Sequence, residues 1–300
     1  MLTFPATYGA GPIGTAAYTA PVRAPMQNLI LLSPAASDAA VLSASAQAAG
    51  LPVSNLQTIQ PAQKWQAAGT AASITITATT PFVATALALV GHNFSADALL
   101  RLRAAAVQGN VVANPDLDTG WQGAWPLFGK PPVTNWPNWL SLLTWSNTSA
   151  FQFWQLDIVD PGNTVGYLEA GRLALGVPWQ PSLNFDVAGS PLGFDQLDVQ
   201  SKTAWGRTFT DARATSAART FNIQITAVDR REVTAGLVEI QRLRGLWGDV
   251  ICCLDPAEPS DFHLFSMQGY FVPKPDYPIV PQYTENGVMF TAKLQLAEFL

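Results

Sequence analysis

The sequence predicts a mainly β protein in two parts, a β-sandwich followed by an α+β domain. Three observations support this prediction. Apolar residues alternate with polar residues at a period of two in most of the patterned segments. Residues 231–247 are the one segment with the three- and four-residue apolar spacing of a helix. The length of 300 residues is about twice that of a typical domain, so two domains are expected.

The first 27 residues are rich in Gly, Pro, Ala and Thr and have no sustained period. This composition predicts an extended arm, residues 1–27, that becomes ordered against a neighbour. Residues 9–14 match GxGxxG, but no strand precedes them, no helix follows, and Pro12 lacks an amide hydrogen. A dinucleotide-binding loop needs the preceding strand, the following helix and the backbone amides that meet the pyrophosphate, so no cofactor is expected. No signal peptide and no long apolar run is present, so we expect no membrane insertion.

The first domain is expected over residues 28–183, because strand patterns and turn residues follow one another at the spacing of a β-sandwich. The strand 28–32 is expected to open this domain. Residues 33–50 are small and leave a short helix and a loop as alternatives. The later strands are expected at residues 73–77, 82–91, 98–106, 151–159 and 167–176.

A Trp-rich segment, residues 109–147, interrupts the strands and is expected to be a long functional or interface loop. Clustered indoles anchor protein interfaces, stack on sugar rings or fill cores, and all three alternatives stay open here. Trp154 lies on a predicted strand and is expected to fill the core. The candidate interface or glycan contacts are Trp121, Trp125, Trp136, Trp139 and Trp145.

The second domain is expected over residues 184–300. Residues 220–228 alternate strictly and predict a half-buried strand. The helix over 231–247 has Asp229 as a candidate N-cap and Gly248 as a candidate stop. Further strands are expected at residues 250–254, 263–272 and 288–296, and a helix among antiparallel strands is typical of an α+β domain.

The charge content limits the function. Charged residues make up 12% of the chain, against about 25% in ordinary soluble proteins. A surface so poor in charge is typical of a subunit that buries much of itself against neighbours. The net charge of −5 provides no basic surface, so no nucleic-acid specificity is expected.

Residues able to support catalysis or metal binding are few. His92 and His263 are the only histidines. His92 is expected to be a turn or packing residue, and His263, which could orient a carboxylate, is expected to face solvent. Cys252 and Cys253 are adjacent in an apolar run that predicts a buried strand, since vicinal cysteines rarely bridge. The protein is therefore not expected to be an enzyme.

Two groups of carboxylate and amide side chains could supply oxygen ligands to a calcium ion. The first group could alternatively supply an acid/base pair, but both its position and its residue types are explained more simply by a turn. We therefore expect no metal site. The first group is Asp157, Asp160, Asn163 and Glu169, and the second is Asn114, Asp116 and Asp118.

A resemblance adds to this interpretation. Residues 151–176, FQFWQLDIVDPGNTVGYLEAGRLALG, predict a strand, a turn and a second strand pattern, either as a hairpin or as a connection between sheets. Together with residues 51–65 and 86–103, this segment resembles the discoidin-like, galactose-binding-like jelly roll of uncharacterised phage tail proteins. The resemblance covers residues 28–181 and implies a jelly-roll sandwich.

A second resemblance concerns residues 190–300. The sequence RTFNIQITAVDRREVTAGLVEIQRLRG, followed by LDP, SMQGYF and AKLQLAEF, is similar to the ring-forming domain of distal tail proteins and baseplate hub subunits. In that family the ring domain precedes the galactose-binding-like domain, whereas here the order is reversed.

These resemblances imply a structural virion protein of a phage tail tip or baseplate, assembled in the host bacterial cytoplasm. The expected partners are further copies of the chain in a ring and other tail or baseplate proteins. The alternative is a carbohydrate-binding adhesion module that contacts host-surface glycans.

Overall fold

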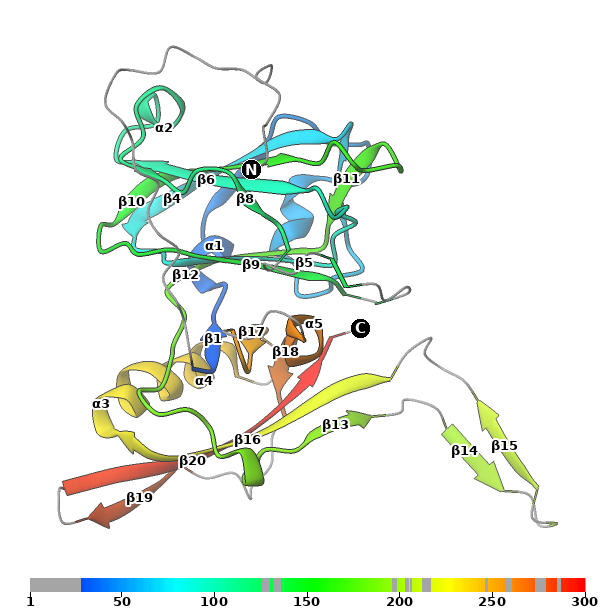
Figure 1. The fold of residues 1–300 in the computed structure, drawn as a ribbon, viewed down its shortest axis with the longest axis vertical. Helices are drawn as coiled ribbons and strands as arrows, with labels where there is room; N and C mark the ends of the chain where they lie inside the picture. Colours follow the sequence, from blue (N-terminus) through cyan, green and yellow to red (C-terminus); the bar gives the residue numbers. More distant parts are fainter. Residues whose placement is uncertain are drawn as a thin grey trace, which may run out of the picture.

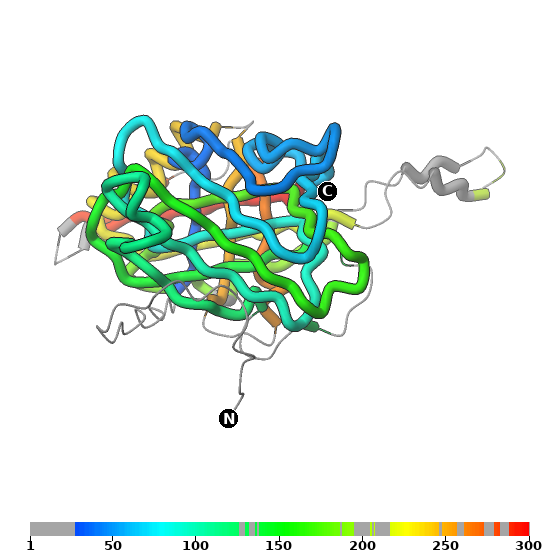
Figure 2. The backbone as a smooth tube through the Cα atoms, turned by 90° about the horizontal axis from the view of Figure 1, so that it is seen from above, coloured from blue at the N-terminus to red at the C-terminus, as the bar shows by residue number. Residues whose placement is uncertain are grey.

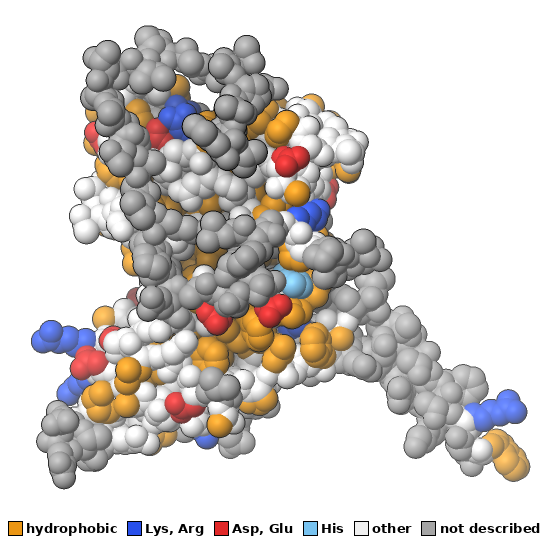
Figure 3. All heavy atoms as spheres, viewed as in Figure 1, with side chains coloured by type: hydrophobic (Ala, Val, Ile, Leu, Met, Phe, Trp, Pro, Cys, Tyr) orange, Lys and Arg blue, Asp and Glu red, His pale blue; other side chains and the backbone are white. Residues whose placement is uncertain are grey.

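The computed structural model describes residues 28–125, 130–131, 136, 138–195, 199–202, 205, 207–211, 217–245, 248–256, 261–272, 279–284 and 287–299. The predicted arm over 1–27, with its GxGxxG match, lies outside them. The chain is mainly β with few helices, as predicted, and folds into a sandwich above a second sheet (Figure 1). The face seen in Figure 3 carries few charged side chains, in keeping with the charge content.

The sandwich has two main sheets. The six-stranded sheet contains, in spatial order, β2 (Val41–Ala44), β4 (Ala71–Phe82), β10 (Phe151–Val159), β6 (Leu99–Ala105) and β7 (Leu117–Asp118), with β8 (Gln122–Gly123) also on β6. The three-stranded sheet contains β12 (Arg172–Gly176), β5 (Ala86–Val90) and β9 (Leu140–Thr144). A two-stranded pair contains β3 (Trp65–Ala68) and β11 (Tyr167–Ala170).

Alternating side chains of the two sheets build the sandwich core. On β10, Trp154, Leu156 and Ile158 are fully buried, and they lie in one cluster with Ile74 and Ile76 of β4. Successive long strands alternate between the sheets, β4 to β5, β5 to β6 and β9 to β10, as a jelly roll requires. The predicted β-sandwich is confirmed, and Trp154 is a core residue as expected.

The segment 151–176 connects sheets and is not a hairpin. β10 pairs with β4 and β6, whereas β11 pairs with β3 and β12 pairs with β5. The turn that separates them is held by Asp160, whose carbonyl accepts from the Asn163 amide at 3.2 Å. The turn chemistry predicted for this stretch is confirmed.

The prediction that residues 109–147 form one long loop is wrong. The segment contains the short helix α2 (Asn110–Ala113), the strands β7 and β8, and β9, every residue of which is buried. Leu143 faces the sandwich core, while Leu140 and Leu142 face the second sheet. A strand buried on both faces does not alternate, which is why the pattern was missed. Residues 33–50 contain both a helix, α1 (Ala35–Asp38), and the strand β2, and η1 (Val53–Gln57) follows.

The second sheet has seven strands. Their order is β1 (Ile30–Leu32), β17 (Val250–Cys253), β18 (Ser266–Phe271), β20 (Gly287–Glu298), β16 (Ala218–Asp229) and β13 (Leu192–Asp195), and β19 (Ile279–Thr284) also pairs with β20. A hairpin of β14 (Val199–Lys202) and β15 (Thr208–Asp211) projects away from the body (Figure 1). The 3-10 turn η2 (Val187–Gly189) precedes β13.

One continuous helical segment covers this sheet, as predicted. It comprises α3 (Arg230–Glu232), the π-helical turn η3 (Val233–Leu237) and α4 (Val238–Arg244). Asp229 caps its start by accepting from the Arg231 amide at 2.7 Å. Val233 and Leu237 pack into the core of the sheet. The predicted strands 220–228, 250–254 and 288–296 are also confirmed, whereas the strand predicted for 263–272 begins as a helix, α5 (Phe262–Phe265).

The first strand belongs to the second sheet. β1 was expected to open the sandwich, but Ile30 pairs with Cys253 and Leu31 with Cys252 of β17. The sandwich is therefore inserted between β1 and the remaining strands of the second sheet. The second domain is therefore discontinuous in the sequence, and the expected boundaries, 28–183 and 184–300, assign β1 to the wrong half.

The sandwich and the second sheet pack closely (Figures 1 and 2). Ile30, Leu32 and Ile251 lie in one buried cluster with Ala88 and Leu142 of the three-stranded sheet. Cys252 and Cys253 are buried in β17, as predicted, and burial raises the pKa of Cys252 well above its usual value. The C-terminal α+β unit is present, and its ring-forming role stays a prediction.

Candidate functional site

The tryptophans of residues 109–154 lie in three different environments. Trp145 and Trp154 are fully buried in the sandwich core. Trp145, one of the predicted contacts, is therefore a packing residue in this structure. It was grouped with the surface rings because the strand that precedes it, β9, was not predicted.

Three further tryptophans form a junction aromatic cluster with His263, which belongs to α5 of the other half of the molecule. Trp125 and Trp139 meet edge to face at 5.1 Å between ring centroids, and Trp136 lies 6.1 Å from Trp139. His263 lies 5.0 Å from Trp136. The cluster thus connects the sandwich to the second sheet.

Cations cover the rings of this cluster. The Lys130 ammonium lies 5.3 Å from the Trp125 centroid and 5.6 Å from that of Trp139. The Arg219 guanidinium lies 4.9 Å from the Trp136 centroid and is held by Glu298 through bonds of 2.9 and 2.5 Å. Because the rings contact one another and these cations, the cluster is a packed junction.

His92 is buried beside this cluster and stacks on Phe94 at 4.2 Å. Its Nδ1 accepts from the Phe94 amide at 3.3 Å, so the neutral ring carries its proton on Nε2, 2.8 Å from Ser141 Oγ. That nitrogen donates to Ser141 and does not accept the hydroxyl proton, as a general base would have to. The expected packing role of His92 is confirmed.

Trp121 is the exception among the clustered tryptophans, because 46% of it is exposed. It lies between β7 and β8 at one edge of the six-stranded sheet. Gly120 before it has a φ of +66°, a conformation that glycine adopts without strain. The Arg101 guanidinium lies 6.0 Å from the indole centroid. We call Trp121, Arg101, Asp118 and Gln122 the Trp121 surface.

Asp118 fixes the geometry of the Trp121 surface. It accepts from Arg101 Nε at 2.9 Å and also from Arg101 Nη2, and the Gly120 amide donates to it at 2.8 Å. Burial alone would raise the pKa of Asp118, but these bonds and the charges of Arg101 and Arg103 outweigh it and lower the pKa. The carboxylate therefore stays ionised and orients Arg101 beside the indole.

Polar side chains continue from this surface across the same sheet. Arg103 forms an ion pair with Asp157 at 2.6 Å, and Asp157 also accepts from Ser73 and Gln155, each at 2.7 Å. In the strand register, Asp157 lies between Ser73 and Arg101. Arg103 and Asp157 are themselves buried, so this network supports the sheet beneath the surface on which Trp121 and Arg101 lie.

The two predicted oxygen groups do not converge. Asp157 pairs with Arg103, while Asp160 accepts from the Ser95 amide at 2.8 Å and from the Ser95 hydroxyl. Asp116 accepts from the Ala106 amide at 2.9 Å. In the part of the chain that the structure describes, no group of three or more His, Cys, Asp or Glu residues is arranged to hold a metal ion.

The sequence analysis missed Arg101 and the role of Asp118. Arg101 and Arg103 alternate with buried leucines on a predicted strand, so their outward direction was available as a signal. The position of Asp118 beside them could not be predicted, because β7, the strand that carries it, has only two residues.

No protein-family model and no curated protein matches this chain. Among the described residues, no helix is long and apolar enough to cross a membrane.

Several solved structures are similar to part of this chain. The family 32 carbohydrate-binding module of NanJ from Clostridium perfringens, in complex with galactose, has 12% identity and a TM-score of 0.33 over 49% of this chain and 98% of that chain. A module from a family 31 glycoside hydrolase of the same organism has 14% identity and a TM-score of 0.35 over 47% and 97%. A fucolectin from striped bass serum has 10% identity and a TM-score of 0.36 over 65% and 73%. The predicted phage assignment is not tested by these similarities.

Proposed function

We propose that this protein binds carbohydrate and that the sugar stacks on Trp121. The carrying observation is the half-exposed indole flanked by the oriented Arg101–Asp118 pair. The face of a pyranose ring carries C–H groups that pack on an indole, while its hydroxyls need fixed polar partners at the edge of the ring. The Trp121 surface supplies both kinds of contact.

The proposed activity is binding and not chemistry. His92 carries its proton on Nε2, which faces Ser141, so the ring cannot accept the Ser141 hydroxyl proton as the base of a nucleophile would. The Asp118 and Asp157 carboxylates are each paired with an arginine. These side chains hold geometry at the surface instead of exchanging protons with a ligand.

A glycan array followed by calorimetry on the best ligand tests the proposal. Trp121→Ala is expected to lower the affinity at least tenfold, because stacking contributes most of the apolar contact. Trp205→Ala, which removes a tryptophan that is 93% exposed on the projecting hairpin, is the matched control and is expected to bind as the parent does. Equal binding by the parent and Trp121→Ala would overturn the proposal.

A second candidate function is that of a structural subunit in a larger assembly. The favouring observation is the β14–β15 hairpin, which projects from the body and carries Trp205, 93% exposed, in its turn. Phe194 on β13, the strand that precedes the hairpin in the sequence, is 59% exposed. Exposed aromatic rings on a projecting strand pair suit insertion into a neighbour. A virion tail-tip subunit, forming a ring with its own copies and contacting other tail proteins in the bacterial cytoplasm, is the specific form proposed from the sequence.

Light scattering on the purified chain tests this candidate. The parent is expected to form an oligomer of defined size, and Trp205→Ala combined with Phe194→Ser is expected to be smaller. A monomeric parent at all accessible concentrations would remove this candidate and leave the carbohydrate proposal untouched.

A further inference from the structure

The outer face of β16 and β20 carries a compact set of polar side chains. On both strands the apolar residues turn to the core, so the intervening residues lie on the opposite face. Register places Asn222 opposite Gln295 and Gln224 opposite Lys293. These four residues, two cross-strand pairs next to each other on one face, form what we call the polar square.

A cavity lies over the polar square. It has a volume of about 390 Å³, which falls within the range of about 300–1,000 Å³ typical of small-molecule sites. Gly189 and Pro191, from the segment that runs beside β16, complete its wall. A Cβ atom at Gly189 would lie 3.1–3.2 Å from the Gln224 side chain, so glycine allows this segment to approach closely.

Neighbouring bonds hold the floor of the cavity in place. Gln224 Nε2 donates to Asp186 at 3.3 Å, and the Gln224 amide donates to Ser190 Oγ at 2.9 Å. Asp186 also accepts from Thr226 Oγ1 at 3.0 Å. Gln224 uses one of the two Nε2 hydrogens on Asp186 and retains the side-chain oxygen Oε1 as an acceptor for a ligand.

The lining selects for a particular chemistry. Three carboxamides provide donors and acceptors together, and Lys293 provides donors with a positive charge. The nearby Asp186 carboxylate does not line the cavity and accepts from Gln224 and Thr226 behind it. Such a lining suits a molecule with several hydroxyls and one negative charge, because each hydroxyl can both donate and accept.

We propose that the polar square binds the carboxylate-bearing unit of an acidic sugar. Lys293 pairs with the carboxylate, and Asn222, Gln224 and Gln295 bind the ring hydroxyls. The proposal rests on the proposed carbohydrate function only for the class of ligand, since the polar square lies on the second sheet and the Trp121 surface lies on the sandwich. The two sites can therefore fail independently.

Titration calorimetry or protein-observed NMR with D-glucuronate, D-glucose and acetate tests the proposal. Glucuronate is expected to bind, and glucose and acetate to bind at least tenfold more weakly, because each lacks one half of the recognised chemistry. Lys293→Gln is expected to weaken glucuronate binding at least tenfold, and Gln295→Ala to weaken it severalfold. Arg230→Gln, which removes an exposed positive charge from the same half of the chain, is the control and is expected to bind as the parent does.

Three outcomes would overturn the proposal: no glucuronate binding at millimolar concentration, unchanged binding by Lys293→Gln, or acetate binding as tight as glucuronate, which would indicate a simple anion site. Circular dichroism verifies that each variant is folded. Trp121→Ala should leave glucuronate binding unchanged. Neutral-glycan binding that is lost in Trp121→Ala reports on the Trp121 surface alone. Glucuronate binding in the same variant reports on the polar square alone, so the failure of one site is distinguished from the failure of the other.

Discussion

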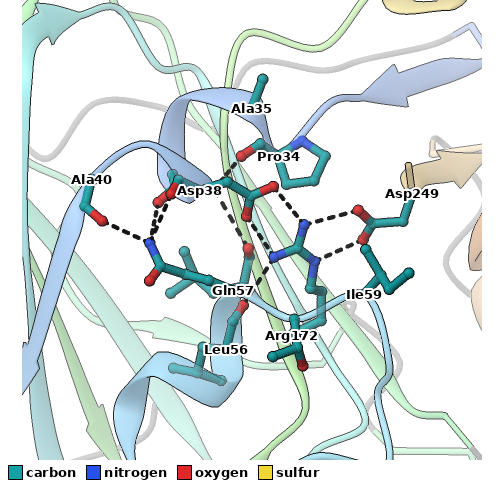
Figure 4. A network of polar contacts seen from close by, with 12 residues as sticks. Pro34, Ala35, Asp38, Ala40, Leu56, Gln57, Ile59, Arg172 and Asp249 are labelled. Atoms are coloured by element: carbon teal, nitrogen blue, oxygen red, sulfur yellow. Dashed lines mark hydrogen bonds and ion pairs between the residues drawn. The ribbon is translucent and has the colours of Figure 1, made fainter. Parts of the chain in front are cut away.

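Arg172 on β12 and Asp249, immediately before β17, form a bidentate ion pair between the sandwich and the second sheet (Figure 4). Nε and Nη2 of Arg172 lie 2.7 and 2.8 Å from the two carboxylate oxygens, and both side chains are fully buried. Asp38 of α1 binds the same guanidinium at 2.6 and 2.9 Å. Burial disfavours the charged form, but the two carboxylates raise the pKa of Arg172 above its usual value.

Arg172→Leu is expected to lower the free energy of unfolding by about 3–5 kcal/mol, because it leaves the Asp249 carboxylate buried without its counter-ion. Urea denaturation measures this change. Arg242→Leu breaks the exposed pair of Arg242 with Glu239 and serves as the control, with no measurable change expected. An Arg172→Leu midpoint equal to that of the control would show that the junction does not depend on this ion pair.

Much of the fold was accessible from the sequence because many strands are buried on one face only. Apolar and polar residues alternate in the sequence along the middle of β10 and of β16, and the helical segment after Asp229 has regular apolar spacing with a capping aspartate. In each case a local pattern reports directly on the buried face. Both strands were predicted within two residues. The helix was expected to run to residue 247 and stop at Gly248, but it ends at Arg244 with Gly245 as its C-cap.

The remainder depended on long-range contacts that no local pattern encodes. β1 is an apolar run that suits either half of the molecule, and only its pairing with Cys252 and Cys253 assigns it to the second sheet. β9 is buried on both faces, so its sequence lacks the alternation that marks a strand and could equally belong to an apolar part of a loop. The candidate site suffered in the same way, because Trp145 was grouped with Trp121 although it directly follows the buried strand β9, and the two have opposite exposure.

Stability should fall as the pH decreases through the range where unfolded histidine gains a proton. Burial lowers the pKa of His92 well below its usual value, and the nearby Lys64 and Lys130 lower it further. Below about pH 6.5 the unfolded chain therefore binds a proton that the folded chain does not, and the free energy of unfolding decreases. Above that pH both states hold a neutral His92, and this contribution to the free energy of unfolding no longer changes with pH.

Denaturation curves between pH 7.5 and 5 check this prediction. His92→Gln retains a donor towards Ser141 and should flatten the pH dependence relative to the parent. The pKa of His263 is also lowered, first by burial, with Asp261 opposing and Arg219 assisting, so His263→Gln should flatten the curve as well, but less. Identical slopes for the parent and His92→Gln would contradict the assignment.

Gly236 allows the helical segment to approach Trp179. A Cβ atom at Gly236 would lie 2.0 Å from Trp179 Cδ1, while the indole Nε1 donates to the Glu232 carbonyl at 2.9 Å. Gly236→Ala is therefore expected to destabilise the fold by about 3 kcal/mol, because the Trp179 ring must move out of a packed position. Thermal melting compares it with Gly109→Ala, where a Cβ atom would meet nothing within 4 Å. If both variants melt alike, Trp179 is not packed as described.

Ala227 is the one non-glycine residue among those described with a positive φ, +58°, and it lies where the pairing of β16 with β20 shifts register between Ile225 and Val228. This left-handed conformation costs an L-residue about 1–2 kcal/mol, whereas glycine adopts it freely and loses about 0.5–1 kcal/mol through extra freedom in the unfolded chain. Ala227→Gly should therefore raise the free energy of unfolding by about 0.5–1 kcal/mol, measured by urea denaturation. Ala218→Gly, at a buried position of the same strand, should instead lower it, since no strain is relieved there. A loss of stability in both variants would mean that the bulge at Ala227 is not strained.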